Sequence, residues 1–135
     1  MPQVAQHFFK TGILFLIVGI AMGLGMAISG NHDVIGAHAH TNLLGWVTSA
    51  LFGGYYALNP GKAESKLAAI HFWVYTAGVA TMVPSLYLLL RGFAALEPVV
   101  VVSSLVTFSG VLLFAVVVFR TPAPQRLGMT PASLR

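Results

Sequence analysis

The chain has 135 residues, of which 57% are hydrophobic and only 7% are charged, and its formal net charge is +4. Its mean hydropathy is +0.85. A soluble domain of this length cannot bury so much apolar surface, so the composition excludes an ordinary soluble protein and indicates a membrane protein. Because there is no cysteine, a disulfide framework, a thiolate iron–sulfur site and a thiolate nucleophile are also excluded.

Apolar runs without Asp, Glu, Lys or Arg predict four transmembrane helices, because each can cross a hydrocarbon core of about 30 Å. Tyr55 and Tyr56 close the second run, as is typical of a membrane interface, and Pro84 predicts a kink in the third. The short linkers predict an up-down antiparallel bundle, so we expect an all-α membrane protein in which residues 1–135 form a single domain. The four runs are 11–29, 34–58, 68–90 and 99–119.

The basic residues predict the orientation of this bundle. Only Arg91 falls on one side of the four-span arrangement, and the other basic residues fall on the opposite side. By the positive-inside rule, both termini then lie in the cytoplasm, and we expect the inner membrane of a bacterium. The positive charge is therefore a sign of topology and not of nucleic-acid binding. The residues on the cytoplasmic side are Lys10, Lys62, Lys66, Arg120, Arg126 and Arg135.

Two histidines stand at the outer end of the second predicted helix, in the stretch GAHAHTNLLGW at 36–46. Residues two apart on a helix point about 200° away from each other, so His38 and His40 face nearly opposite sides and cannot chelate one ion together. An imidazole at membrane depth costs free energy unless it binds something. Small residues nearby leave room for a flat, bulky group such as a porphyrin: Gly36, Ala37, Ala39 and Gly45.

The other histidines are further candidates with weaker signals. His7 and His71 lie toward the cytoplasmic end, and nearly all of the second helix, about 25–30 Å at 1.5 Å per residue, separates His71 from His40. A lone histidine near a helix end is most often an interfacial residue, and we expect this of His7, His32 and His71. His32 and His71 are nevertheless additional candidate metal ligands.

The segment HAHTNLLGW, at the outer end of a helix that runs from outside to inside, resembles the heme-copper oxidase superfamily, the catalytic subunits of terminal oxidases and nitric oxide reductases. The resemblance lies within 34–58 and implies a b-type heme with His38 and His40 as axial ligands of the iron. It implies a cytochrome b-like role in electron transport, or a redox role linked to O₂ or NO. Because C-x-x-C-H is absent, the heme would be held non-covalently. The expected cofactor-binding residues are His38, His40, Asn42, Gly45 and Trp46.

Departures from that family leave enzymatic activity open. The family's copper site uses a histidine followed four residues later by a tyrosine, together with two adjacent histidines. Four residues after His38 stands Asn42, and no two histidines are adjacent. The four predicted spans also contain no Asp, Glu, Lys or Arg that would relay protons. We therefore do not expect an oxygen-reducing proton pump.

The chain length suggests how the predicted ligands are brought together. The family's twelve helices form three arcs of four, and this chain resembles one arc, so we expect a homotrimer. His38 of one subunit and His40 of the next would then hold a heme across each interface. We expect Gly12, Gly19 and Gly23 of the first helix to be the contact surface between subunits, because small residues let helices approach closely. A protein or a quinol would donate or accept the electrons.

Two other functions are alternatives to heme binding. In the first, His32, Asp33, His38 and His40 form an outer-face copper or zinc site of a metal-handling membrane protein, since imidazole suits both metals. In the second, the chain is an assembly subunit without a cofactor. A Soret band from purified protein would distinguish heme binding from both alternatives.

Overall fold

The computed structural model describes residues 1–121, and almost all of them are helical. Arg126 and Arg135, which contribute to the predicted orientation, lie outside the described residues. Within residues 1–121 there is no β-strand. The elements are α1 (Gln3–Ser29), α2 (Ile35–His40), η1 (Thr41–Thr48), α3 (Ser49–Leu58), α4 (Pro60–Ala63), α5 (Lys66–Leu90), η2 (Ala94–Leu96) and α6 (Glu97–Phe119).

Three of the helical segments are long and apolar enough to cross a membrane: Gln3–Ser29, Lys66–Leu90 and Ala94–Phe119. Large apolar side chains cover their outer surfaces; Leu14 is 63% exposed and Phe108 is 58% exposed. Soluble monomers rarely expose continuous apolar surface of this kind. The structure is thus that of an all-helical integral membrane protein with lipid-facing helices.

The segment predicted as the second helix, 34–58, is helical from Ile35 to Leu58 but is divided into three parts. Backbone angles at His40, Thr41, Thr48 and Ser49 are all right-handed helical, so the axis continues through both junctions. Between the junctions, Thr41–Thr48 is a π-helix, in which hydrogen bonds reach five residues back. The hydroxyl of Thr48 follows this register and donates to the carbonyl oxygen of Leu43 at 2.8 Å. The sequence predicted an uninterrupted helix here.

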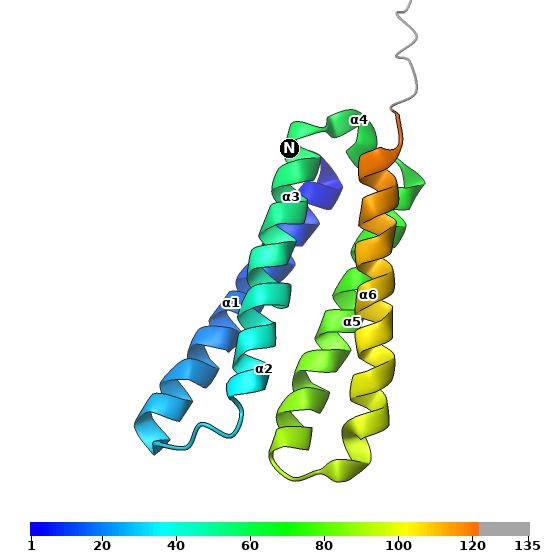
Figure 1. The fold of residues 1–135 in the computed structure, drawn as a ribbon. Helices are drawn as coiled ribbons and strands as arrows, with labels where there is room; N and C mark the ends of the chain where they lie inside the picture. Colours follow the sequence, from blue (N-terminus) through cyan, green and yellow to red (C-terminus); the bar gives the residue numbers. More distant parts are fainter. Residues whose placement is uncertain (122–135) are drawn as a thin grey trace, which may run out of the picture.

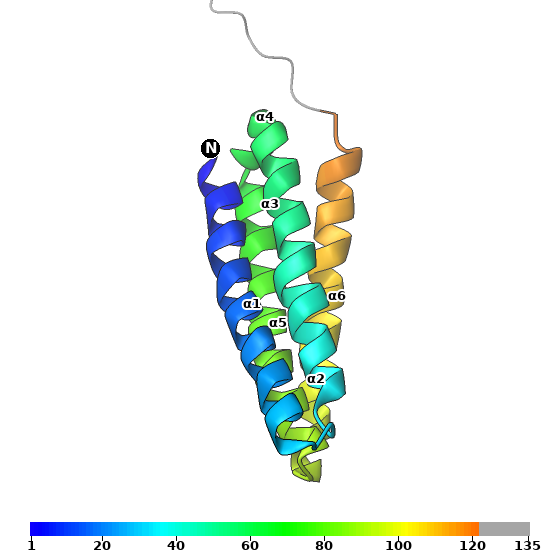
Figure 2. The same cartoon turned by 90° about the vertical axis from the view of Figure 1, so that its left-hand side faces the viewer.

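The helices pair as two hairpins (Figure 1). α1 packs chiefly against η1 and α3, and α5 packs chiefly against α6. Both views place the N-terminus, α4 and the end of α6 at one end of the bundle, and they place the α1–α2 loop and η2 at the other end (Figures 1 and 2). We refer to these as the terminal end and the far end. Sequential helices are neighbours and antiparallel, as the short linkers predicted.

Helix boundaries differ most from the prediction at the start of α1, which begins at Gln3 and not at residue 11. Val4, Ala5 and Phe8 of this extra length are buried in the bundle, so tertiary packing stabilises a helical turn that the apolar run alone does not predict. α5 begins at Lys66, where the hydroxyl of Ser65 accepts the backbone N–H of Ala68 at 3.1 Å and caps the helix.

Glycines of α1 meet side chains of the α2–α3 segment in an antiparallel series. A Cβ at Gly12 would lie 3.1 Å from Cε3 of Trp46, and a Cβ at Gly19 would lie 2.5 Å from Oδ1 of Asn42. A Cβ at Gly23 would lie 3.0 Å from Cε1 of His38. The prediction that these three glycines form the contact between subunits is therefore wrong, because the close approach is made within one chain.

Candidate functional site

His38 lies at the contact between α2 and α1, and its side chain is half-buried. Its Nδ1 atom is 2.8 Å from the carbonyl oxygen of Gly19. A carbonyl oxygen can only accept, so Nδ1 carries the hydrogen and Nε2 of the neutral ring keeps a lone pair. Within residues 1–121 that Nε2 atom has no hydrogen-bond partner, and it is not completely buried.

Asn42, one helical turn after His38, packs beside this ring. Its side-chain amide donates to the carbonyl oxygen of His38 at 2.9 Å and lies 3.3 Å from Nδ1 of the same residue. The other side of Asn42 fits against Gly19. The imidazole is thus held by a carbonyl of α1, and the amide of Asn42, which bonds to the backbone of His38, lies beside the ring.

His40 lies on the outward surface of the same helix and is exposed. Its Nδ1 is 2.8 Å from the carbonyl oxygen of Gly36, so this ring too presents Nε2 as the unprotonated nitrogen. Its neighbours on the outward surface include Leu43, which is 59% exposed. A shallow recess of about 190 Å³ is formed by Ala39, His40, Leu43 and Leu44.

The other three expected cofactor-binding residues are engaged in packing. Gly45 is buried, and a Cβ there would lie 2.6 Å from Cβ of Phe15. Trp46 packs over Gly12, and Asn42 packs over Gly19. The expected room for a flat group at Gly45 is therefore absent, because Phe15 of α1 fills it. Around His40 the surface is more open, since a Cβ at Gly36 would contact only the side chain of Leu90 at 3.4 Å.

The far-end loop does not bring its candidate ligands together. His32 and Asp33 are exposed, and Nδ1 of His32 donates to the carbonyl oxygen of Gly30 at 3.2 Å. The backbone N–H of Asp33 donates to the side chain of Asn31 at 2.8 Å. Among residues 1–121, no three histidine or carboxylate side chains converge on a position for a metal ion. One copy of the chain therefore does not form the alternative copper or zinc site.

His71 lies near the terminal end and is fully buried, which corrects the expectation that it is an interfacial residue. Its Nδ1 atom is 2.9 Å from the hydroxyl of Tyr56, and its Nε2 atom has no partner. Aromatic rings from three other helices surround it: the ring centroids of Phe52, Phe8 and Phe114 lie 4.6, 5.0 and 5.3 Å away. We call His71, Tyr56 and these three rings the aromatic cage.

The aromatic cage and His38 are separate sites. Both contact α1, the cage at Phe8 and His38 at Gly19. The two contacts are therefore about 16 Å apart along the helix axis at 1.5 Å per residue. His7 is also near the cage end, with its ring 5.2 Å from that of Phe72. No one metal ion can bind both His71 and His38 of a single chain.

Tyr75 stands four residues after His71, so the chain does contain a histidine followed four residues later by a tyrosine, which corrects the expectation based on His38 alone. The two ring centroids are 6.1 Å apart. The hydroxyl of Tyr75 donates to the carbonyl oxygen of Leu44 at 2.9 Å and so joins α5 to the π-helical segment. The signal that would have found this pair was the H-x-x-x-Y spacing itself, at 71–75.

The three imidazoles thus differ in the surroundings of Nε2. At His71 this atom is completely buried, and at His38 and His40 it is not. His38 and His40 are each held through Nδ1, as the histidine ligands of metal sites commonly are. No family model, curated protein or solved structure matches the chain.

Proposed function

We propose that this chain is a four-span membrane protein that binds b-type heme non-covalently through His38 and His40. The observation that carries the proposal is that each imidazole donates its Nδ1 hydrogen to a backbone carbonyl, of Gly19 and of Gly36. Histidines that ligate metals almost always hold their second nitrogen in this way, because it fixes the tautomer and raises the basicity of Nε2. Bound heme would supply one-electron redox chemistry.

The position of His40 gives independent support. It lies on an outward surface that also exposes Leu43, Val47 and Leu51. An imidazole on a lipid-facing surface is unfavourable, and polar residues in such places are characteristically functional. Ligation of iron, or burial against another copy of the chain, removes this cost.

A single chain offers one imidazole in each of two directions, so each heme needs its second axial ligand from elsewhere. His38 faces α1 of its own chain, whereas His40 faces away from the bundle. We infer a closed homotrimer in which His38 of one subunit and His40 of the next bind one heme. Two imidazoles leave no open position on the iron, which favours electron transfer, with a protein or a quinol as the partner, over O₂ or NO binding.

The charge distribution supports four spans with both termini in the cytoplasm. Among the described residues, Lys62, Lys66 and Arg120 lie at the terminal end and Lys10 lies in the same half, whereas Arg91 is at the far end. The α2–α3 segment also exposes large apolar side chains along its length, as a lipid-facing helix must. We therefore count this segment as the fourth span, in the inner membrane of a bacterium.

The decisive experiment is an absorption spectrum of the full chain purified from membranes in mild detergent. We expect a Soret band with sharp α and β bands on reduction. His38→Ala and His40→Ala should each remove most of the heme. His32→Ala is the matched control, because it deletes an exposed imidazole at the same end, and it should retain the full heme content.

Three outcomes would contradict the proposal. Full heme in both single variants would exclude the axial ligands. Colourless protein would exclude heme, and elemental analysis would then separate a copper or zinc protein from an assembly subunit without a cofactor. A heme-loaded monomer in native mass spectrometry would exclude ligands shared between subunits.

A further inference from the structure

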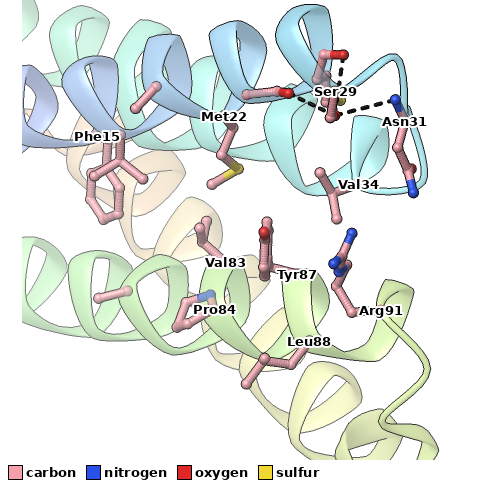
Figure 3. A pocket seen from close by; sticks show the side chains of 15 residues that line it. Phe15, Met22, Ser29, Asn31, Val34, Val83, Pro84, Tyr87, Leu88 and Arg91 are labelled. Atoms are coloured by element: carbon pink, nitrogen blue, oxygen red, sulfur yellow. Dashed lines mark hydrogen bonds between the residues drawn. The ribbon is translucent and has the colours of Figure 1, made fainter.

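A groove of about 790 Å³ lies between α1 and α5 (Figure 3). Its walls are apolar, with Phe15 and Met22 from α1 and Val83 and Leu88 from α5. Its mouth, at the far end of the bundle, is polar. We call this cavity the α1–α5 groove.

The length of the α1–α5 groove matches one leaflet of a bilayer. Its lining extends along α5 from Ala80 to Arg91, which is about 16 Å at 1.5 Å per residue. Half of a hydrocarbon core of about 30 Å has nearly the same depth. The groove is also open to its surroundings, because lining residues such as Ala21 and Pro84 are exposed. An acyl chain that lies parallel to the helices would fit this space.

Polar groups without partners gather at the mouth of the groove. Figure 3 shows the side chain of Arg91 at this mouth, and Asn31 and Tyr87 line the same groove. Within residues 1–121, Arg91, the amide nitrogen of Asn31 and the hydroxyl of Tyr87 make no hydrogen bond through their side chains. These groups can together donate several hydrogen bonds to one anionic group.

Arg91 is also the one lysine or arginine at the far end among the described residues. A cation at this end opposes the charge bias that orients the helices. Asp33 and Glu97 share the far end, but neither lines the groove and neither forms an ion pair with Arg91. The charge of Arg91 is therefore available to a ligand.

We propose that the α1–α5 groove binds an anionic phospholipid of the leaflet at the far end. One acyl chain lies between α1 and α5, and the phosphate group accepts hydrogen bonds from Arg91, Asn31 and Tyr87. A zwitterionic lipid with the same chains binds less well, because its head group carries no net negative charge. The proposal rests on the proposed membrane span but not on heme binding.

The test is native mass spectrometry of the full chain in detergent with an equimolar mixture of phosphatidylglycerol and phosphatidylcholine of identical acyl chains. We expect one phosphatidylglycerol to be retained per chain, in preference to phosphatidylcholine by about tenfold, because the choline cation is repelled by Arg91. Arg91→Gln should reduce this preference to about equal retention. Lys66→Gln, which removes an exposed charge at the other end of the same helix, should leave it unchanged.

A second variant tests the groove independently of charge. Ala21→Trp places a large side chain on the wall and should reduce retention of both lipids while Arg91 is intact. The helical circular dichroism of each variant, measured on the same samples, shows that the fold persists, and the heme spectrum of these samples reports separately on the proposed function.

Four results would overturn the proposal. The first is equal retention of the two lipids by the native chain, and the second is an unchanged lipid preference in Arg91→Gln. The third is a loss of preference in Lys66→Gln as large as that in Arg91→Gln. The fourth is a lipid-free oligomer that Ala21→Trp dissociates, because a second copy of the chain would then fill the groove.

Discussion

Nδ1 of His38 and the carbonyl oxygen of Gly19 lie 2.8 Å apart and join α2 to α1. The approach is this close because Gly19 and Gly23 have no side chains on the face that receives the ring. The hydrogen bond sets the tautomer of His38, and the glycines set the position of the ring. α1 is therefore the structural support of the proposed ligand, although it contributes no side chain of its own.

Gly19→Ala should weaken heme binding without unfolding the protein. The new Cβ would lie 2.5 Å from Oδ1 of Asn42, so Asn42 or α1 must move, and this movement disturbs the hydrogen bond from His38 to the carbonyl oxygen of Gly19. Loss of such a supporting contact typically costs about 10–100-fold in metal affinity. A heme titration of the apoprotein, followed at the Soret band, measures the change.

The matched control is Gly25→Ala on the same helix. A Cβ at Gly25 has nothing within 4 Å, so this variant keeps the native heme affinity and gains a little helix stability. If Gly19→Ala and Gly25→Ala bound heme equally well, the support of His38 by α1 would not matter for binding.

Single cysteines should reveal four spans, since the native chain has none to interfere. In intact bacterial cells, a membrane-impermeant maleimide should label His32→Cys in the α1–α2 loop and Ala95→Cys in η2. Glu64→Cys, between α4 and α5, should be labelled only after the cells are made permeable. All three positions are exposed, so access to reagent depends on the side of the membrane.

The same experiment separates the four-span arrangement from one with three spans. If the α2–α3 segment did not cross the membrane, the loops that flank it would lie on one side. His32→Cys and Glu64→Cys would then be labelled together. Labelling of Glu64→Cys alone in intact cells would reverse the proposed orientation.

The apolar runs predicted the helices well, because a run of about 20 apolar residues without charge forms a helix that spans the bilayer, and such a run can be read from the sequence alone. The ends of α5 and α6 agree with the prediction within a few residues. The early start of α1 was not predictable in this way. Phe8 stabilises that turn through contacts with Phe52 and Phe72, which lie far along the chain.

The candidate site was predictable only in part. The spacing of His38 and His40 correctly indicated opposite faces, since two residues on a helix have a fixed angle between them. The partner of each face was not predictable, because small residues such as Gly19 indicate a close approach but not the helix that makes it. The burial of His71 was not predictable either, because the rings that surround it come from three other helices whose packing the sequence does not specify.

Lys62→Met should destabilise the terminal end of the bundle. The ammonium group of Lys62 donates to the carbonyl oxygen of Val118, in the last turn of α6, and to the hydroxyl of Tyr55, both at 2.8 Å. Carbonyls of a final helical turn lack partners within the helix, and a cation there is favourable. Methionine keeps the apolar stem but loses both bonds, so we expect a loss of about 1–2 kcal/mol in the free energy of unfolding.

Lys66→Met is the control for this prediction, because Lys66 is exposed and its side chain makes no hydrogen bond within the described residues. Its midpoint of thermal unfolding in detergent, followed by circular dichroism, should stay close to the native value. A shift as large as that of Lys62→Met would show that any positive charge at this end stabilises the bundle, and that the hydrogen bond from Lys62 to the end of α6 contributes no more.

Tyr56 and His71 should show a strong coupling in a double-mutant cycle, because they are each other's only side-chain hydrogen-bond partners in the described residues. Tyr56→Phe leaves His71 without any partner in the aromatic cage, and such an unpaired buried group costs about 1–3 kcal/mol. His71→Leu leaves the Tyr56 hydroxyl unpaired at a similar cost. The double variant removes both polar groups, together with the Nε2 atom that already lacks a partner, so it should be more stable than either single variant.

Thermal unfolding of the four proteins measures the coupling, and additive losses would mean that the hydrogen bond contributes nothing. The heme spectrum should stay unchanged throughout, since the cage is about 16 Å from the His38 contact along α1. A spectrum that collapsed in His71→Leu would place His71 among the heme ligands and contradict the proposed site.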